Sequence, residues 1–176
     1  RIGWTYKVGS TGEVETYDVN GHIVNIANRN GLIKTLYYSD PTTPTSITSA
    51  PDLLIRVTDA LGHQIKFTYD NSNRISTLTN PAGGVYTYTY STDTNNNLSS
   101  VTYPDGKTKT YLYGEAANVS ATPNAGVSYA NALTGIIDEN NNRYATYRYD
   151  AAGRAYDEEL AQALGSTLGA PIEHNN

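Results

Sequence analysis

Hydrophobic and polar residues alternate along most of the chain with the period of two that is typical of β-strands. In residues 85–90 (VYTYTY), Tyr86, Tyr88 and Tyr90 take one face of the predicted strand, and the intervening threonines take the other. Tyr and Thr suit a pleated, half-buried surface. The pattern therefore predicts an all-β chain whose strands share one aromatic face.

Each predicted strand ends in a short polar turn rich in Asp, Asn and Gly. Residues 18–21 (DVNG) and 70–73 (DNSN) are two examples, and the apolar Ile23 and Ile75 follow them. Asp and Asn side chains bond to nearby backbone groups, while Gly and Asn accept the positive φ that tight hairpin turns require. Strand and turn therefore alternate, which predicts an antiparallel β-hairpin meander.

A fixed spacing between turn and strand end indicates that the chain is built of repeats. A Gly lies seven residues before a Tyr at four places, the first being Gly31 and Tyr38, and Asn142 takes the place of Gly before Tyr149. Asn is the residue best able to replace Gly in a left-handed backbone conformation. The repeat is about 21 residues long. The structural positions that we expect to recur are Tyr17, Asp18, Gly21, Gly31, Tyr38, Gly62, Tyr69, Asp70, Gly83, Tyr88, Tyr90, Gly106, Tyr111, Tyr113, Asn142, Tyr147, Tyr149, Asp150 and Gly153.

We expect residues 1–156 to form an array of about six such repeats. Three longer steps between successive tyrosines indicate insertions at 41–52, 92–97 and 115–131. Insertions are tolerated in surface loops because loop-closure entropy grows slowly with length. These three segments are therefore predicted to be exposed.

Residues 157–176 depart from the repeat. In the segment DEELAQAL, Leu160 and Leu164 have helical spacing, Asp157 is a candidate N-cap, and Gly165 follows the segment. The pattern predicts a short C-terminal helix, followed by an unassigned tail.

Composition narrows the classes of function. The chain has 16 Tyr but no Cys and no Met, and its formal net charge is −5. Without Cys there is no disulfide, no thiolate zinc site and no thiol nucleophile, and the acidic charge argues against nucleic-acid binding through a basic patch. No apolar run is long enough for membrane insertion as a helix. The absence of Cys and Met fits an exported protein, and the first residue, Arg1, indicates a piece of something longer.

The residue types that could carry chemistry lie in turns rather than in clusters. His22 and His63 each follow a turn Gly and lie two repeats apart, so a shared metal ion is not expected. Asp18, Asp70 and Asp150 each follow a strand-end Tyr, which is a turn-capping place rather than a catalytic carboxylate pair. We therefore predict no catalytic residue, no metal site, no cofactor and no enzymatic activity.

The aromatic face is the one feature that suggests a ligand. Exposed Tyr can stack on sugars or on the bases of a single strand, worth about 1–3 kcal/mol per base. The alternative is a packed face of cross-strand pairs, each worth about 0.2–1 kcal/mol. The acidic charge and the one-sided periodicity favour packing, and glycan binding through the tyrosines stays open as an alternative.

The recurring unit, Tyr-Asp-x-x-Gly-Arg followed by apolar residues, Asp/Asn-Pro-x-Gly and Thr-x-Tyr-x-Tyr, resembles the YD repeat of the Rhs family. Residues 17–21, 69–70, 80–83 and 149–154 carry the resemblance, and residues 133–154 look particularly like the bacterial Rhs subgroup. The C components of insecticidal toxin complexes and the animal teneurins are more distant relatives. The resemblance covers residues 13–156.

In that family, YD repeats coil into a β-spiral that closes as a hollow shell around a C-terminal toxin domain. The resemblance implies that this chain is a structural, non-enzymatic shell segment of a secreted or cell-surface bacterial protein, with flanking YD repeats and a toxin domain as partners. The chain lacks the Asp-Pro-x-Gly-Leu motif in which the family's shell core ends. Two other hypotheses are a subunit that assembles with its own copies through open β edges and a glycan-binding module. Neither nucleic acid nor membrane insertion is expected.

Overall fold

The computed structural model describes residues 3–161, and over this range the chain is all-β, as the alternating pattern predicts. The strands are β1 (Trp4–Lys7), β2 (Val14–Tyr17), β3 (Ile23–Ala27), β4 (Ile33–Tyr38), β5 (Leu54–Thr58), β6 (Gln64–Tyr69), β7 (Ile75–Thr79), β8 (Val85–Tyr90), β9 (Leu98–Thr102), β10 (Thr108–Tyr113), β11 (Leu133–Ile137), β12 (Arg143–Tyr149) and β13 (Ala155–Leu160). The helical element of this range is a single 3₁₀ turn, η1 (Ala116–Asn118).

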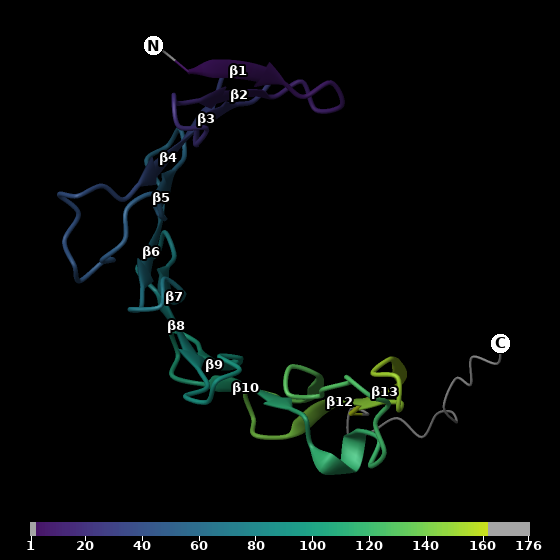
Figure 1. Ribbon diagram of the computed structural model, residues 1–176. Helices are drawn as coiled ribbons and strands as arrows, with labels where there is room; N and C mark the ends of the chain where they lie inside the picture. The colour runs from purple at the N-terminus through teal and green to yellow at the C-terminus, as the bar shows by residue number, and fades with distance from the viewer. Residues whose placement is uncertain (1–2, 162–176) are drawn as a thin grey trace. The chain divides into compact units, whose positions relative to one another are not determined.

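The strands follow one another in sequence order across one open antiparallel sheet. Figure 1 shows β4 to β7 edge-on as a single layer. In the described residues no long helix and no second sheet covers either face. β1 and β13 are the edge strands, each with a hydrogen-bonded neighbour on one side. The predicted antiparallel hairpin meander is therefore confirmed.

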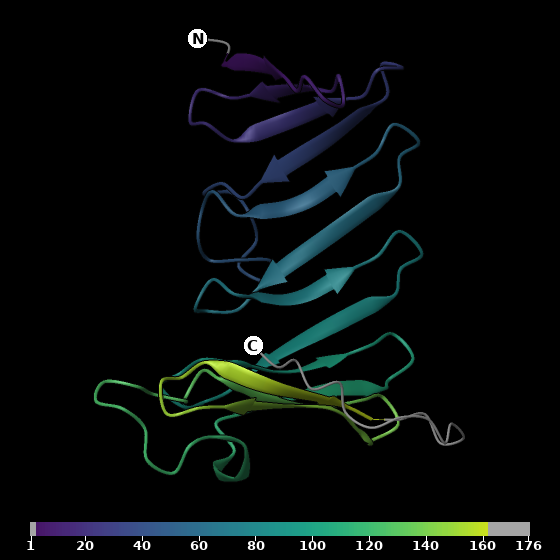
Figure 2. The ribbon, with the colours of Figure 1, turned by 90° about the vertical axis from the view of Figure 1, so that its right-hand side faces the viewer.

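The chain divides into two compact units. The first is formed by the residues up to 89 together with 101–107, and the second by residues 90–100 and those from 108 onward. In the first unit, Figure 2 shows the strands running back and forth, joined by tight turns and by the long β4–β5 loop at the left of the view. This loop comprises residues 39–53. In the second unit, the longest connection is the β10–β11 loop, residues 114–132.

Within residues 3–161, eight tight turns share one backbone geometry. In the β6–β7 turn, the amide of Asp70 donates to the carbonyl of Arg74, and the amide of Asn73 donates to the carbonyl of Asp70. Asn73 has a left-handed φ of 59°. The residues at the same place in the other seven turns, all with positive φ, are Gly21, Gly31, Gly62, Gly83, Gly106, Asn141 and Gly153. A Cβ at Gly62 or Gly106 would meet no atom within 4 Å, so backbone conformation, not space, requires Gly or Asn there.

Asn142, predicted to replace the turn Gly before Tyr149, is one residue away from the left-handed position. Asn141 takes that conformation, with φ of 62°. The reason is that β12 has seven residues, whereas β4, β6, β8 and β10 have six each. A register shift between Ile136 and Ile137 absorbs the additional residue. Counting seven residues back from the strand-end Tyr therefore stops one residue short of the turn position.

The short helix predicted from Asp157 is wrong over the residues that the structure describes. Residues Ala155–Leu160 form β13, which pairs with β12 in a register that places Arg148 opposite Asp157. Arg148 forms ion pairs with both Asp157 and Glu159. The open edge of β12 supplies backbone partners and a cation, which outweigh the weak preference of a short isolated segment for helix. The second half of the predicted helix lies outside the described residues.

Little of this sheet is buried. Among the described residues, the apolar core consists of Val101 and Ala145, which are 8% and 1% exposed. Along β8, Tyr86, Tyr88 and Tyr90 are half-buried, while the threonines between them are exposed. Stability therefore rests on the hydrogen-bond ladder and on contacts between neighbouring strands, as in other repeat arrays.

The cross-strand register gives the first unit an apolar face and a polar face. Because directly paired residues point to the same side of a sheet, each row of pairs belongs to one face. One row of the apolar face contains Leu36, Val57 and Ile65. One row of the polar face contains Thr35, Thr58 and Gln64. The tyrosines of β8 continue the apolar face, since Tyr86 pairs with Leu78 of β7.

Candidate functional site at the tyrosine ends of the hairpins

The strand-end tyrosines make one recurring hydrogen bond. The hydroxyl of Tyr38 donates to the carbonyl of Ile23 at 3.1 Å, and that of Tyr69 donates to the carbonyl of Leu54 at 2.7 Å. The same contact in the second unit joins Tyr113 to Leu98 and Tyr149 to Leu133, each at 3.0 Å. In every case the acceptor is the first residue of the preceding strand. This contact holds the two strands of each hairpin in register at the end away from their connecting turn.

Burial further disfavours the charged form of three of these hydroxyls. Desolvation raises the pKa of Tyr38, Tyr69 and Tyr113 above the ordinary value for tyrosine. A protonated hydroxyl that already donates to the backbone is fixed in place. We therefore assign these tyrosines a structural role.

The remaining predicted tyrosines also lie in the strands. The hydroxyl of Tyr17 donates to Glu15 at 2.6 Å, and its ring stacks on Trp4 with the centroids 5.4 Å apart. The half-buried strand tyrosines are Tyr88, Tyr90, Tyr111 and Tyr147. The aromatic face is thus partly covered by its own neighbours rather than offering a row of open stacking platforms.

Asp and Asn begin seven of the eight tight turns and satisfy the same two backbone groups in each. In the β6–β7 turn, Asp70 Oδ1 accepts hydrogen bonds from the amides of Ser72 and Arg74 at 2.8 and 3.0 Å. The residues with the equivalent pair of bonds are Asp18, Asn28, Asp59, Asn80, Asp138 and Asp150. The sequence pattern identifies only the three aspartates that follow a Tyr. The signal for the others is an Asp or Asn three residues before the left-handed Gly or Asn.

These hydrogen bonds favour the charged form of four turn carboxylates, whose pKa is lowered: Asp18, Asp59, Asp70 and Asp150. The pKa of Asp150 is lowered because the guanidinium and the amide of Arg154 donate to it. Partial desolvation acts to raise the pKa of Asp70, but hydrogen bonds from the side chain and amide of Arg74 outweigh it and the pKa is lowered. A carboxylate held in this way is a poor proton donor at neutral pH. The turn aspartates therefore cap turns and do not form an acid–base pair.

The described histidines are partners of turn aspartates. His22 Nδ1 lies 3.2 Å from Asp18 Oδ2, and His63 Nδ1 lies 2.9 Å from Asp59 Oδ2. The His22 ring also stacks on Tyr38, with the centroids 4.5 Å apart. Within residues 3–161, no three His, Asp or Glu side chains form a group able to hold a metal ion. Across that same range, no helix has the length and apolar character that crossing a membrane requires.

The β4–β5 loop closes with the same backbone bonds as a tight turn. The amide of Ser39 donates to the carbonyl of Leu53, and the amide of Asp52 donates to the carbonyl of Ser39, at 2.8 and 2.9 Å. Asp52 has the left-handed φ of 63°. Ser39 Oγ accepts a hydrogen bond from the amide of Leu53 at 2.9 Å, as the turn aspartate does elsewhere. The inserted residues thus lie inside an intact turn closure.

Each of the two long loops also forms a hydrogen bond with the end of the next hairpin, at or directly after its strand-end Tyr. In the first unit, the carbonyl of Ile47 in the β4–β5 loop accepts a hydrogen bond from the amide of Tyr69 at 2.7 Å. In the second unit, the hydroxyl of Tyr129 in the β10–β11 loop donates to the carbonyl of Asp150 at 2.7 Å. Each loop therefore covers the last residues of the following hairpin.

The base of the β10–β11 loop is tied to β12 by a bidentate ion pair. Both carboxylate oxygens of Glu115 accept hydrogen bonds from the guanidinium of Arg143, at 3.0 and 2.7 Å. Arg143 also donates to the carbonyl of Thr134, a residue that is fully buried. The hydrogen bonds from Arg143 lower the pKa of Glu115. The sequence does not reveal this pair, because its members are 28 residues apart and belong to no recurring motif.

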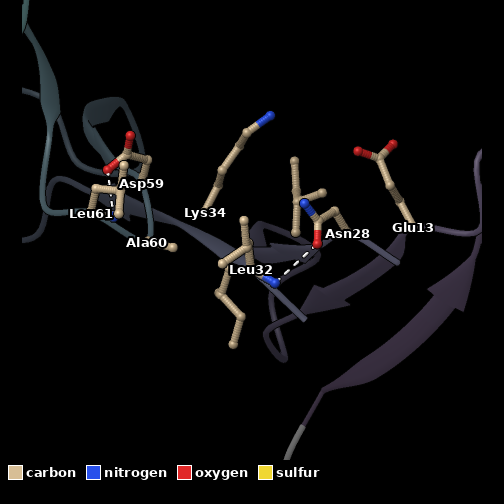
Figure 3. A pocket seen from close by; sticks show the side chains of 9 residues that line it. Glu13, Asn28, Leu32, Lys34, Asp59, Ala60 and Leu61 are labelled. Atoms are coloured by element: carbon tan, nitrogen blue, oxygen red, sulfur yellow. Dashed lines mark hydrogen bonds between the residues drawn. The ribbon is translucent and has the colours of Figure 1, made fainter. Parts of the chain in front are cut away.

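An open cleft lies at the turn ends of the hairpins, away from the strand-end tyrosines, between the β3–β4 and β5–β6 turns. It holds about 250 Å³ and is lined by Glu13, Ile26, Asn28, Leu32, Ile33, Lys34, Asp59, Ala60 and Leu61. In Figure 3, Glu13 and Lys34 extend separately, while Asn28 and Asp59 bond to the backbone of their own turns. Leu61 at the rim is 79% exposed. The cleft offers no nucleophile paired with a base, so it does not provide a hydrolytic site.

Comparison with known proteins agrees with the repeat geometry. Residues 52–85, from the left-handed Asp52 to the start of β8, match the family model RHS Repeat. No curated protein matches the chain significantly. Two solved structures with a similar fold are the crystal structure of TcdB2-TccC3-Cdc42 and the Tc holotoxin pore of Photorhabdus luminescens, the latter with a substitution in TccC3.

The likeness to these two structures is one of fold. Their TM-scores to this chain are 0.53 and 0.51, with sequence identities of 13% and 14%. The matches cover 83% and 81% of this chain, which spans only 7% and 6% of the solved chains. The matched repeat and the shared fold together confirm the resemblance found in the sequence: residues 52–85 match an Rhs repeat, and the chain resembles components of Tc toxins in fold.

Proposed function

We propose that this chain is a non-enzymatic wall segment of an exported bacterial Rhs-type protein, which uses the wall to enclose and deliver a toxin domain. The observation that carries the proposal is the almost coreless sheet, in which repeated tyrosine and turn contacts join strand to strand while neither face is covered by another layer of the described chain. Such an array forms an extended surface rather than a pocket. The fold shared with Tc toxin structures supports the same assignment.

Flanking YD repeats are the partners that this proposal requires. All four residues of the edge strand β1 are exposed, and Trp4 and Tyr6 are 53% and 58% exposed. The unpaired backbone of an edge strand is a template for a further strand. In the whole protein, we expect neighbouring repeats to continue the sheet at β1 and at β13 and to cover these two rings.

The test uses the whole parent protein. Electron microscopy is expected to show a hollow shell with density inside, and limited proteolysis is expected to spare the enclosed domain. Deleting residues 39–69 joins Tyr38 to Asp70 and so removes one complete repeat with every remaining turn intact. This deletion should open the wall and expose the domain to protease, whereas the surface substitution Leu61→Ser should not. Equal digestion of the domain in the wild type and in the deletion variant would contradict enclosure.

The exposed edges favour one second candidate, a subunit that assembles with its own copies. Light scattering on the purified chain in dilute solution distinguishes the two proposals. A mass that is a multiple of 19.1 kDa supports self-assembly, and a stable monomer of that mass contradicts it. Glycan binding through the tyrosines has no comparable support, because four strand-end hydroxyls already donate to the backbone.

A further inference from the structure

On the polar face of the first unit, two cations lie side by side without a carboxylate. The register places Arg56 of β5 directly opposite Lys66 of β6. Like charges directly opposite one another destabilise a sheet. Within residues 3–161, neither side chain makes an ion pair or a hydrogen bond. The chain therefore maintains a local concentration of positive charge that it does not neutralise itself.

Six other cations of the described chain have partners within it, whereas Lys7 and Lys34 form no ion pair. The ion pairs are Arg74 with Asp70, Lys109 with Glu139, Arg143 with Glu115, Arg148 with Asp157, and Arg154 with Asp150. Arg29 donates instead to the backbone carbonyls of Ser10 and Thr11. In a chain with a net charge of −5, a cation pair without carboxylates is a departure from this pattern. Such a surface attracts an external anion.

Arg56 is held in place by an aromatic ring rather than by a carboxylate. Its guanidinium carbon lies 3.8 Å from the centroid of Tyr37, on the neighbouring strand β4. This cation–π contact leaves the hydrogen-bonding groups of the guanidinium unused. Arg56 Nε and the nearby Thr58 Oγ1 are covered and have no hydrogen-bond partner in the described chain. Unsatisfied buried polar atoms are unusual in a folded protein.

An open cleft adjoins Lys66 on the same face. It holds about 310 Å³ and is lined by Gly62, His63, Gln64, Lys66, Thr79, Asn80, Pro81 and Gly83. Thr79 lies in the same cross-strand row as Arg56 and Lys66. The row therefore brings Lys66 and the Thr79 hydroxyl to the cleft beside the amide of Gln64, and it places Arg56 next to Lys66, outside the cleft lining. The volume of the cleft suits a small ligand.

We infer that this cleft binds an acidic sugar, whose carboxylate lies between Arg56 and Lys66 and whose ring hydroxyls bond to Gln64 and Thr79. A guanidinium and an ammonium are the natural partners of a carboxylate. An acidic peptide fits less well. β5 and β6 are paired on both sides and offer no edge for strand addition, and the lining has no apolar groove for side chains. The site is on the polar face and does not involve the half-buried tyrosines of the aromatic face.

The test is calorimetric titration of the purified chain with trigalacturonate at low ionic strength, with its methyl ester and tetraglutamate as the other probes. Trigalacturonate is expected to bind, and added salt is expected to weaken binding. Arg56→Gln and Lys66→Gln should each weaken it by about tenfold or more, the loss of one charge-assisted contact. Lys34→Gln is the matched control, because Lys34 lies opposite Ile26 on the other face and is also exposed. This control should leave the affinity unchanged.

Neither substituted side chain makes a hydrogen bond or an ion pair within residues 3–161, so both variants are expected to fold, and their thermal midpoints check this. The inference is overturned if trigalacturonate does not bind, if the methyl ester binds equally well, or if both variants keep the wild-type affinity. If tetraglutamate binds as tightly as trigalacturonate, the inference of a sugar ligand is wrong and an acidic peptide is the better candidate.

Discussion

The β6–β7 turn and the β4–β5 loop connect equivalent strands with very different lengths of chain. Residues 70–74 form the turn and residues 39–53 form the loop, and each follows directly on a strand-end Tyr. Both close with the same pair of backbone hydrogen bonds and both place a left-handed residue, Asn73 or Asp52, two positions before the next strand. The strand register at the closing Tyr is shifted in the same way in both.

The two connections differ in the side chain that begins them. Asp70 is partly exposed and pairs with Arg74, whereas Ser39 is 3% exposed and donates its hydroxyl to the carbonyl of Ala50. The difference shows that closure geometry, rather than connection length, defines the repeat. Residues inserted between the closing hydrogen bonds cost little entropy. They can also contact the next hairpin, as Ile47 does by accepting a hydrogen bond from the amide of Tyr69.

The largest loss of stability is expected from replacing the first side chain of the loop, Ser39, and it should exceed the loss from replacing the first side chain of the turn, Asp70. Ser39→Ala removes the acceptor of the Leu53 amide and the donor to Ala50 at a buried site, so we expect the free energy of unfolding to fall by about 2–3 kcal/mol. Asp70→Ala should cost about 1 kcal/mol, because water can replace the lost bonds of an exposed turn. Urea denaturation measures both. Equal losses would mean that the long loop closes no differently from the turn.

The left-handed residues should respond alike in the two connections. Asn73→Val and Asp52→Val each place a β-branched residue at positive φ and should cost about 1–2 kcal/mol. Glycine at either position should be neutral or mildly stabilising, and it serves as the control. Thermal unfolding of the four variants checks this. If valine is tolerated at Asp52 alone, the loop does not need the turn closure.

The strand-end tyrosine bond should be independent of the connection that follows it. Tyr38→Phe and Tyr69→Phe each remove one hydroxyl that donates to a backbone carbonyl, with an expected loss of about 1 kcal/mol. Amide hydrogen exchange in the adjoining strands should become faster by a similar factor in both variants. A loss confined to one variant would show that the loop, not the repeat, sets the strength of this contact.

Replacing residues 39–53 with the five residues of the β6–β7 turn should preserve the hairpin. The change removes the bond between Ile47 and the amide of Tyr69 but shortens the loop, so we expect a net change within about 1 kcal/mol. Cross-strand proton contacts between β4 and β5 measure the register directly. A shifted register would contradict the view that the closure alone defines the repeat.

The smallest effect at neutral pH is expected from Asp70→Asn, since Asn28 and Asn80 already make the same two backbone bonds in other turns. The pKa of Asp70 is lowered in the folded chain. Its contribution to stability is therefore present above the ordinary pKa of about 3.9 and is lost as the pH falls through the lowered value. When the free energy of unfolding is measured at decreasing pH, it should fall less steeply in the variant than in the wild type. Identical profiles would contradict the role of the charge.

Local patterns predicted those parts of the molecule that depend on neighbouring residues. Alternation identifies a strand such as β8, because side chains two residues apart share a face. The turn at Asp70 is also local, since its side chain bonds two and four residues ahead. Asn142 shows the limit of counting. One additional residue in β12 moves the left-handed position to Asn141, and the alternation alone does not reveal it.

The errors and omissions arise where a residue's partner is distant in sequence. DEELAQAL has the spacing of a helix, but the residues up to Leu160 pair with β12, where Arg148 neutralises Asp157. The pair of Glu115 and Arg143 belongs to no motif. Neither contact follows from local preference, because each requires that the strand register be known first.

By itself the sequence determined that the chain is a meander of β-hairpins, where most of its turns lie, and which family its repeat resembles, because all three depend on spacings within about 21 residues. The tertiary structure decided which carbonyl each strand-end Tyr reaches, that the long loops keep the turn closure, and that Arg56 stands opposite Lys66. The physical reason is cross-strand register. A shift of one residue exchanges the two faces of a strand, and only the folded sheet shows which register the backbone hydrogen bonds select.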